Sequence, residues 1–256
     1  MTNDLSGKGV LITGASRGIG AATARRVAAR GASIFISGND AEDRFAAVIA
    51  DCRRSAPAGA TFTYGRHDLV EQGAAEAMVE AAAAALGRID CLVNNAAIRI
   101  RQPFGAFSYA DFEKIVAVNV RGPMFASQAV LRHMRAQGGG RIVNVASQMG
   151  QIAEHGSTLY GLTKAALIHL TKSMAFELSA DNIIVNAVSP GPTMTEYNQA
   201  RTSADANLFA HKLSYIPAKR YAEPDEIAEV IEFLLTTSAT FMQGHDLVID
   251  GGYTIH

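Results

Sequence analysis

The stretch Thr13-Gly14-Ala15-Ser16-Arg17-Gly18-Ile19-Gly20 decides the fold of this chain. It follows a short apolar run, Gly9 to Thr13, and it opens an Ala-rich amphipathic stretch that continues to about Arg30. A glycine-rich turn between a strand and a helix gathers backbone N–H groups at the helix N-terminus, where they can bind a pyrophosphate. The spacing Gly-x3-Gly-x-Gly differs from the usual Gly-x-Gly-x-x-Gly, but the place after a strand favours phosphate binding over a simple tight turn.

The rest of the chain repeats this alternation of strand and helix. The predicted strands are Gly9–Thr13, Ser33–Ser37, Thr61–Tyr64, Cys91–Asn94, Arg141–Val145, Ile183–Val188 and Asp246–Ile249. The predicted helices lie at about Gly18–Arg30, Ala41–Ser55, Glu71–Leu86, Asp111–Arg135, Thr158–Leu178 and Asp225–Leu235. This pattern is typical of βαβ units, so we expect an α/β fold: a doubly wound, seven-stranded parallel sheet of the Rossmann type with helices on both faces.

Length and composition favour one domain over residues 1–256. The chain is 48% hydrophobic, which excludes disorder, and its formal net charge of -1 gives no basic surface for nucleic acid or an anionic membrane. Two cysteines, Cys52 and Cys91, cannot form a CxxC metal site or a disulfide framework. No segment approaches the ~20 apolar residues of a membrane helix, and Met1 to Lys8 shows no signal peptide, so we expect a cytoplasmic protein. Residues at about 190–221 form a stretch long enough to be a substrate lid.

Tyr160 and Lys164 lie four residues apart in one predicted helix, so their phenol and ammonium groups share a face. A free tyrosine has a pKa near ~10, and a neighbouring ammonium together with a positively charged nicotinamide would lower it. Alone, such a pair is an ordinary feature of exposed helices. Ser147 follows the fifth predicted strand, where it could donate to a substrate oxygen or simply cap a turn.

Asn119 lies inside a predicted helix, four residues before Pro123. Proline has no N–H, so the main-chain carbonyl of Asn119 loses its helical partner and is free to bind water. A simple kink at the proline is the alternative interpretation.

Together these motifs resemble the classical branch of the short-chain dehydrogenase/reductase family over essentially the whole chain. The resemblance rests on the glycine-rich turn, Asn94-Asn95-Ala96-Ala97, Asn119, Ser147, Tyr160-x3-Lys164, Ser189-Pro190-Gly191 and Asp250-Gly251-Gly252. Ala97 replaces the family's usual Gly, and Ala146 stands where a second Ser is common; both concern the shape of the pocket. The resemblance implies an NAD(P)-dependent oxidoreductase that interconverts a secondary alcohol and a ketone by hydride transfer, with no metal.

The resemblance also implies roles for a catalytic set. Tyr160 would be the general acid in carbonyl reduction and the base in alcohol oxidation, while Ser147 orients the substrate oxygen. Lys164 would bond the nicotinamide ribose and lower the pKa of Tyr160. Asn119 would hold a water through its main chain and extend a proton relay to solvent.

A longer set of residues is expected to bind the cofactor. The set consists of Gly14, Ser16, Arg17, Gly18, Ile19, Gly20, Asn39, Asp68, Leu69, Asn95, Ala96, Tyr160, Lys164, Pro190, Gly191, Thr193 and Thr195. By resemblance, Asp68 would meet the adenine, Asn94 would lie against the cofactor, and Thr193 and Thr195 would hold the carboxamide.

The choice between NADP and NAD depends on residues near the end of the second strand. In dinucleotide-binding folds an acid about 20 residues beyond the glycine motif selects NAD, and a nearby Arg suits NADP. Gly38 stands where the family's NAD-selecting Asp usually lies, and Arg17 resembles the NADP-using pattern. Asp40 would favour NAD if its turn folds inward, because its carboxylate would repel a 2′-phosphate. The sequence thus favours NADP and leaves NAD open.

Arg99 and Arg101 are candidates for substrate contact, together with Ser147. In an extended segment residues two apart share a face, so the two arginines could clamp a carboxylate or simply lie on the surface. The segment from Ile98 to Phe104 resembles gluconate 5-dehydrogenases and related sugar-acid dehydrogenases. The framework also resembles 3-oxoacyl carrier-protein reductases, whose substrate is a thioester. A sugar acid or polyol and a 3-oxoacyl thioester therefore both remain open.

Two further expectations concern partners. The family resemblance implies a homotetramer, built partly from the helices that contain Asp111 and Thr158. The alternative to an enzyme is a nicotinamide-binding sensor or structural subunit without catalysis, because fold does not imply function. The intact set Asn119, Ser147, Tyr160 and Lys164 argues against that alternative.

Overall fold

The computed structural model describes residues 4–204 and 206–255. Its strands all belong to one parallel sheet in the order β3-β2-β1-β4-β5-β6-β7, which confirms the predicted fold class. The strands are β1 Gly9–Thr13, β2 Ser33–Gly38, β3 Phe62–Arg66, β4 Cys91–Asn94, β5 Gly140–Val145, β6 Ile183–Pro190 and β7 Asp246–Ile249. Their bounds lie within two residues of those predicted from the sequence.

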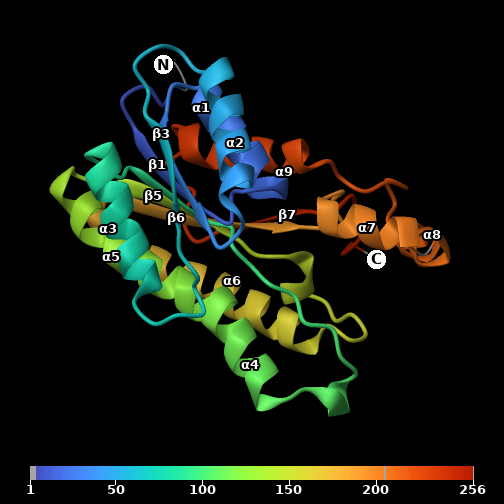
Figure 1. The fold of residues 1–256 in the computed structure, drawn as a ribbon. Helices are drawn as coiled ribbons and strands as arrows, with labels where there is room; N and C mark the ends of the chain where they lie inside the picture. Colours follow the sequence, from blue (N-terminus) through green and yellow to red (C-terminus); the bar gives the residue numbers. More distant parts are fainter. Residues whose placement is uncertain (1–3, 205, 256) are drawn as a thin grey trace.

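Helices cover both faces of the sheet (Figure 1). One layer holds α1 Gly18–Ala29, α2 Glu42–Ser55 and α9 Pro224–Thr236; the other holds α3 Ala74–Leu86, α4 Tyr109–Val116, α5 Gly122–Ala136 and α6 Thr158–Leu178. Short turns of 3-10 helix lie at η1 Phe104–Ala106, η3 Gln148–Gly150 and η4 Ser179–Asp181. Helices α7 Glu196–Ala204 and α8 Ala206–Ser214 project beyond the carboxyl end of β6.

Two hydrophobic cores lie on opposite faces of the sheet. Val10 and Ile12 of β1 point into the core under α1, α2 and α9, and Leu11 between them points into the core under α3, α5 and α6. Successive side chains of a strand alternate between faces. Because both faces are covered, the central strands β1 and β4 are buried along their whole length and mostly apolar, which explains why the sequence pattern located them.

The structure corrects the helix predicted over 111–135. A capping box at Ser108 starts α4 at Tyr109, and the π turn η2 Ala117–Arg121 separates α4 from α5. Pro123 stands in the first turn of α5, where its missing N–H leaves the main-chain carbonyl of Asn119, four residues earlier, without that donor. The expected long helix is therefore two helices joined by a wider turn.

Two other predicted elements change. The helix predicted from Glu71 begins only at Ala74, because Gly73 adopts a left-handed conformation with φ of 81°. The stretch at about 190–221 contains α7 and α8, although its polar sequence gave no helical signal. No helix among the described residues is long and apolar enough to cross a membrane.

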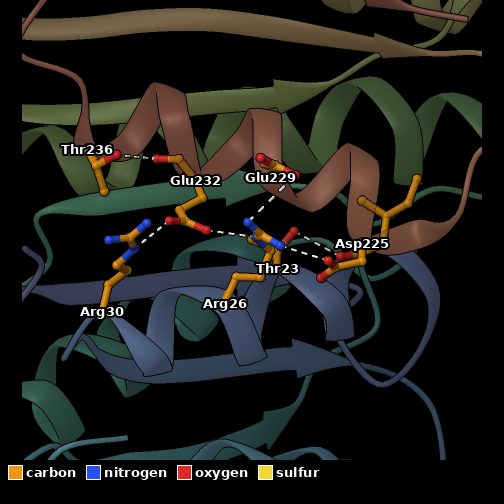
Figure 2. Close-up of polar contacts among 8 residues, drawn as sticks. Thr23, Arg26, Arg30, Asp225, Glu229, Glu232 and Thr236 are labelled. Carbon is orange, nitrogen blue, oxygen red and sulfur yellow. Dashed lines mark hydrogen bonds and ion pairs between the residues drawn. The ribbon is translucent and has the colours of Figure 1, made fainter. Parts of the chain in front are cut away.

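A cluster of charges joins α1 to α9 (Figure 2). The carboxylate of Glu232, only 7% exposed, accepts hydrogen bonds from Arg26 Nε at 2.7 Å and Arg30 Nε at 2.5 Å. Arg26 also donates from Nη1 to Asp225 at 2.7 Å, and Glu229 lies 3.8 Å from its Nη2. These contacts hold α1 against α9, and α1 is the helix that the glycine-rich turn opens.

Candidate active site

A cleft of about 650 Å³ lies at the carboxyl ends of the central strands. It crosses the gap between β1 and β4, where the strand order reverses and where open α/β sheets bind ligands. Of the predicted site residues, the cleft is lined by Gly14, Ser16, Arg17, Gly18, Ile19, Asn39, Asp68, Leu69, Asn95, Ala96, Arg99, Ser147, Tyr160, Lys164, Pro190, Gly191, Thr193 and Thr195. Residues from the ends of six strands, β1 to β6, thus meet in one space.

The glycine-rich turn forms one wall of the cleft. Gly14 has φ of 64°, and a Cβ there would lie 2.7 Å from the Cα of Ala96, so only glycine fits. Helix α1 begins at Gly18, and its N-terminus has neither a side-chain cap nor an acidic residue in its first turn. An uncapped helix N-terminus facing a cleft suits a phosphate group. The residues present therefore fit the pyrophosphate of a dinucleotide.

Gly20 and Asn95 support this turn from behind. A Cβ on Gly20 would lie 2.5 Å from Asn95 Nδ2, so this glycine allows close packing and does not line the cleft. Asn95 Nδ2 donates to the main-chain oxygens of Thr13 and Gly14, both at 2.9 Å. Asn94, expected against the cofactor, instead donates through its buried side chain to Ser127 Oγ at 3.0 Å and Asn144 Oδ1 at 2.9 Å. Asn94 does not line the cleft, since alternate strand residues face opposite sides of the sheet.

The end of the cleft beside β2 carries opposing charges. The hydroxyl of Ser16 donates a short hydrogen bond to the carboxylate of Asp40, and Arg17 Nε lies 3.6 Å from the same carboxylate. Asn39 Nδ2 donates to Asp68 Oδ2 at 3.3 Å. The turn after β2 therefore folds inward and brings Asp40 against the glycine-rich turn.

The opposite wall follows β6. Pro190 ends that strand, and a Cβ on Gly191 would lie 2.6 Å from the Cα of Asp250, so the chain must pass very close here. Thr193 forms a parallel bridge with Ala222 and donates through Oγ1 to the carbonyl of Gly191 at 3.1 Å. These contacts fix the backbone that leads from the sheet into α7.

Tyr160 and Lys164 meet in the middle of the cleft. Lys164 is 2% exposed, its Nζ donates to the carbonyl of Val145 at 2.7 Å, and it lies 5.6 Å from the centre of the Tyr160 ring. Burial lowers the pKa of Lys164 to about 7. Burial also raises the pKa of Tyr160, against the lowering effect of the Arg99 charge and of a hydrogen bond with Ser147. The Arg99 guanidinium lies 5.0 Å from the centre of the ring.

Asn119 lies behind Tyr160 and does not line the cleft. Its Oδ1 accepts from the N–H of Ile98 at 2.9 Å, and its Nδ2 donates to the carbonyl of Ile98 at 2.9 Å and to Thr163 Oγ1 at 3.0 Å. Thr163 in turn donates to the carbonyl of Tyr160 at 2.8 Å. The side chain of Asn119 therefore ties the π turn to the loop after β4 and to α6.

Arg99 and Arg101 meet on the carboxylate of Glu154, a residue that no sequence motif indicates. Arg99 Nη2 makes a short ion pair with Glu154 and donates to Ser157 Oγ at 2.6 Å, and Arg101 Nη1 lies 3.5 Å from Glu154. Lys212 of α8 donates to the same carboxylate at 2.9 Å. The two arginines are thus a pair on one face, as predicted, but they are not a free surface pair.

Gln148 is a second residue without a sequence signal. It lines the cleft beside Ser147, is 1% exposed, and neither its Nε2 nor its Oε1 has a hydrogen-bond partner among the described residues. A buried amide without partners is costly, so a bound molecule would be stabilised by pairing with it. The described residues contain no group of three or more His, Cys, Asp or Glu placed to hold a metal ion.

Comparison with known proteins finds relatives along nearly the whole chain. A model of the family described as Enoyl-(Acyl carrier protein) reductase matches residues 14–254. The chain is 37% identical to cis-4-hydroxycyclohexanecarboxylate dehydrogenase of Sinomonas cyclohexanicum, over 95% of each protein. It is 34% identical to gluconate 5-dehydrogenase of Gluconobacter oxydans (strain 621H), over 98% of this chain and 96% of that protein. A solved 3-oxoacyl (acyl-carrier-protein) reductase from Agrobacterium tumefaciens C58 with NADP bound superposes with a TM-score of 0.92 at 31% identity, covering 98% of this chain and 96% of that one.

Proposed function

Because the chain belongs to the short-chain dehydrogenase/reductase family, whose relatives act on CH–OH groups, we propose that it interconverts a secondary alcohol and a ketone with Tyr160 as general acid and base. The observation that supports this most directly is the meeting of Tyr160, Lys164 and Ser147 in the cleft that starts at the glycine-rich turn. A nicotinamide cofactor would supply the hydride donor or acceptor.

The proton chemistry falls to this chain's own residues. In reduction the phenol of Tyr160 gives its proton to the substrate carbonyl oxygen, and in oxidation the phenolate takes the proton of the alcohol. Burial raises the pKa of Tyr160 and so keeps the proton available for reduction. Cationic Arg99 and the ammonium form of Lys164 stabilise the phenolate that oxidation requires. Ser147 orients the substrate oxygen.

Asn119 would continue the proton path through its main-chain carbonyl. Its side chain is fully engaged with Ile98 and Thr163, so it holds the π turn in place and contributes no donor to substrate. A water on that carbonyl would connect to Lys164, which has donors left after its bond to Val145. Asn119 therefore acts as a positioning residue in this proposal.

The geometry around Asp40 favours NAD(H) over NADP(H), although the sequence alone favours NADP. Asp40 is folded inward against Ser16, the condition under which its carboxylate repels a 2′-phosphate. Its ion pair with Arg17 offsets the positive charge of that guanidinium, and Asp68 adds a further negative charge to this wall. A paired fluorescence titration with NADH and NADPH tests this. Tighter NADPH binding in the wild type would contradict the proposal, and Asp40→Asn should move the preference toward NADPH.

The substrate is proposed to be a polyhydroxylated compound such as a sugar acid or polyol. The unpartnered amide of Gln148 can both donate to and accept from substrate hydroxyl groups, which a fatty 3-oxoacyl chain would not provide. The curated relatives with named substrates include gluconate 5-dehydrogenase. The segment at about 190–221, with α7 and α8, would act as the lid over this substrate within a single domain.

A homotetramer is proposed from exposed apolar side chains on the layer of α4, α5 and α6. These are Tyr109, Phe112, Met124, Leu162 and Phe176. Large exposed apolar side chains on one layer suit a contact surface between subunits. Light scattering of the purified protein measures the mass directly, and a monomer would contradict the proposal.

The substitution Tyr160→Phe tests the catalytic role. It removes only the hydroxyl, so we expect kcat/KM to fall about 100- to 10,000-fold while the Kd of NADH or NADPH changes little. Near-normal turnover would contradict the role of Tyr160. The alternative, a cofactor-binding sensor, predicts tight cofactor binding by the wild type with no turnover across a broad panel of alcohols and ketones.

A further inference from the structure

Three cations surround one carboxylate near Tyr160, and two of these cations, Arg99 and Lys212, line the cleft while Arg101 and Glu154 lie behind its lining. We call this group, Arg99, Arg101 and Lys212 around Glu154, the cation cluster. Arg99 and Arg101 come from the loop after β4, Glu154 from the loop after β5 and Lys212 from α8. Lys212 Nζ lies 2.9 Å from Glu154 Oε1, and both arginines contact Oε2. Four side chains from three separate segments therefore converge on one point.

The charges of the cation cluster do not balance. Three positive groups face one carboxylate, which leaves a formal charge of about +2 at this point. Among the described residues, Glu154 is the one carboxylate paired with these cations; elsewhere in the cleft Asp40 pairs with Arg17 and Glu196 with Arg44. Arg201 of α7 adds a further positive charge near Arg101. The excess lies in a partly buried place, where water screens it poorly.

The surroundings of Arg101 and Lys212 reflect this excess. Burial lowers the pKa of Lys212, and the charges of Arg99 and Arg101 lower it further against the opposite effect of Glu154. Burial and the neighbouring charge of Arg99 lower the pKa of Arg101. The side chain of Lys212 is 16% exposed and that of Arg101 is 28% exposed. An added negative charge would stabilise both groups.

One hydrogen-bond donor of the cation cluster, Arg99 Nε, has no acceptor among the described residues. This nitrogen is buried, while Nη2 of the same guanidinium serves Glu154 and Ser157. A buried unpaired donor on a charged group destabilises the protein until a partner arrives. Charge and hydrogen bonding therefore both point to an acceptor that is not part of the chain.

We infer that the cation cluster binds a carboxylate of the substrate, so that the alcohol or ketone processed at Tyr160 belongs to a hydroxy or keto acid. Glu154 already shows that a carboxylate can be contacted by all three cations at once. The guanidinium of Arg99 lies 5.0 Å from the centre of the Tyr160 ring, so the carboxylate would lie a few bonds from the reacting carbon. Since Lys212 belongs to α8, a bound acid would also hold α8 against the cleft. This inference rests on the proposed function.

The first test measures binding without turnover. Succinate, its diamide succinamide and inorganic phosphate are added to the cofactor-loaded wild-type protein, and the melting temperature Tm is followed against concentration. We expect stabilisation by succinate and none by succinamide. In Lys212→Gln and Arg101→Gln the apparent affinity for succinate should fall about 10- to 100-fold, the effect of losing one hydrogen bond to a charged group. Lys212→Arg should restore it.

Lys219→Gln is the matched control. Lys219 lies in the same segment and carries the same charge, but it is exposed and donates to the carbonyl of Ser214, away from the cation cluster. The Lys219→Gln variant should bind succinate with the affinity of the wild type. Equal effects of succinate and succinamide, or an unchanged succinate affinity in both glutamine variants, would overturn the inference. Stabilisation by phosphate without succinate would overturn the assignment to a carboxylate.

Turnover provides the second test and separates this inference from the proposed function. Secondary alcohols are compared in pairs that differ only in a carboxylate or a carboxamide. We expect the acid to have the higher kcat/KM in the wild type, and Lys212→Gln to reduce that preference about 10-fold or more with little change for the amide. If no alcohol or ketone is turned over, the proposed function fails even where carboxylate binding stands. If the amides and the acids have equal kcat/KM, the inference fails and the proposed function stands.

Discussion

Glu232→Gln tests the charged contact between α1 and α9 quantitatively. The substitution keeps the shape of the side chain and removes the charge that accepts from Arg26 at 2.7 Å and Arg30 at 2.5 Å. Breaking a fully buried ion pair destabilises a protein by about 3–5 kcal/mol. Here Arg26 keeps Asp225, and the two arginine side chains are 25% and 50% exposed, so water compensates part of the loss. We therefore expect a loss of about 2 kcal/mol.

Urea denaturation measures this loss directly. The midpoint should fall at an unchanged slope m, and Tm should fall by about 4 to 8 °C for a chain of this size. Glu229→Gln is the matched control on the same helix, because Glu229 lies 3.8 Å from Arg26 and is 69% exposed. That variant should lose less than about 0.5 kcal/mol. Equal stability of the two variants would refute the reasoning, since it would mean that burial of Glu232 contributes nothing. Cofactor affinity should not change in either variant.

Three further predictions concern the cleft. Burial lowers the pKa of Lys164 to about 7 in the folded, cofactor-free protein, while the unfolded chain keeps a pKa near 10.5. Between about pH 7 and pH 10 the folded protein therefore binds fewer protons than the unfolded chain, so the free energy of unfolding should rise with pH over this window. Lys164→Met should remove this rise in urea titrations at pH 7 and 9 while weakening cofactor binding; an unchanged slope would contradict the shift. Gly14→Ala should weaken NADH or NADPH binding at least ~10-fold in a fluorescence titration, because φ of 64° and the contact with Ala96 leave no room for Cβ; an unchanged Kd would show that the turn adapts. Burial alone would raise the pKa of Glu154, but the charges of the cation cluster hold it at about 2, so the stability it contributes should be lost as pH falls from about 4.5 toward 2. In Glu154→Gln, Tm should therefore change less between pH 4.5 and pH 2 than it does in the wild type. An equal change of Tm in the two proteins would contradict the stabilisation of the Glu154 carboxylate by the cation cluster.

The parts of the fold set by local patterns were predictable. The central strands β1, β4 and β6 are buried on both faces, so an apolar run of a few residues is enough to locate them. The glycine-rich turn was equally predictable from the sequence, because few residues other than glycine adopt the left-handed conformations of Gly14 and Gly18. The cluster of Ser147, Tyr160 and Lys164 also followed, since parallel strands bring their carboxyl ends to one edge of the sheet.

The parts set by contacts between distant segments were not predictable in this way. Glu154 and Lys212 are single charged residues in polar stretches, and nothing nearby in sequence indicates that they meet Arg99. The π turn depends on packing around Asn119, and a periodic apolar pattern cannot distinguish it from a continuous helix. The inward fold of Asp40 likewise depends on its bond to Ser16.

The π turn Ala117–Arg121 also restricts how the length of this chain can change during evolution. Such a turn amounts to one residue inserted into an α-helix. Deleting one residue there would restore a continuous helix and rotate α4 against α5 by about 100°. Asn119 would then leave Ile98 and Thr163, and the buried side of one of the two helices would turn toward solvent. Insertions and deletions should therefore gather in the surface loops of related sequences, while the number of residues between Ser108 and Pro123 stays constant.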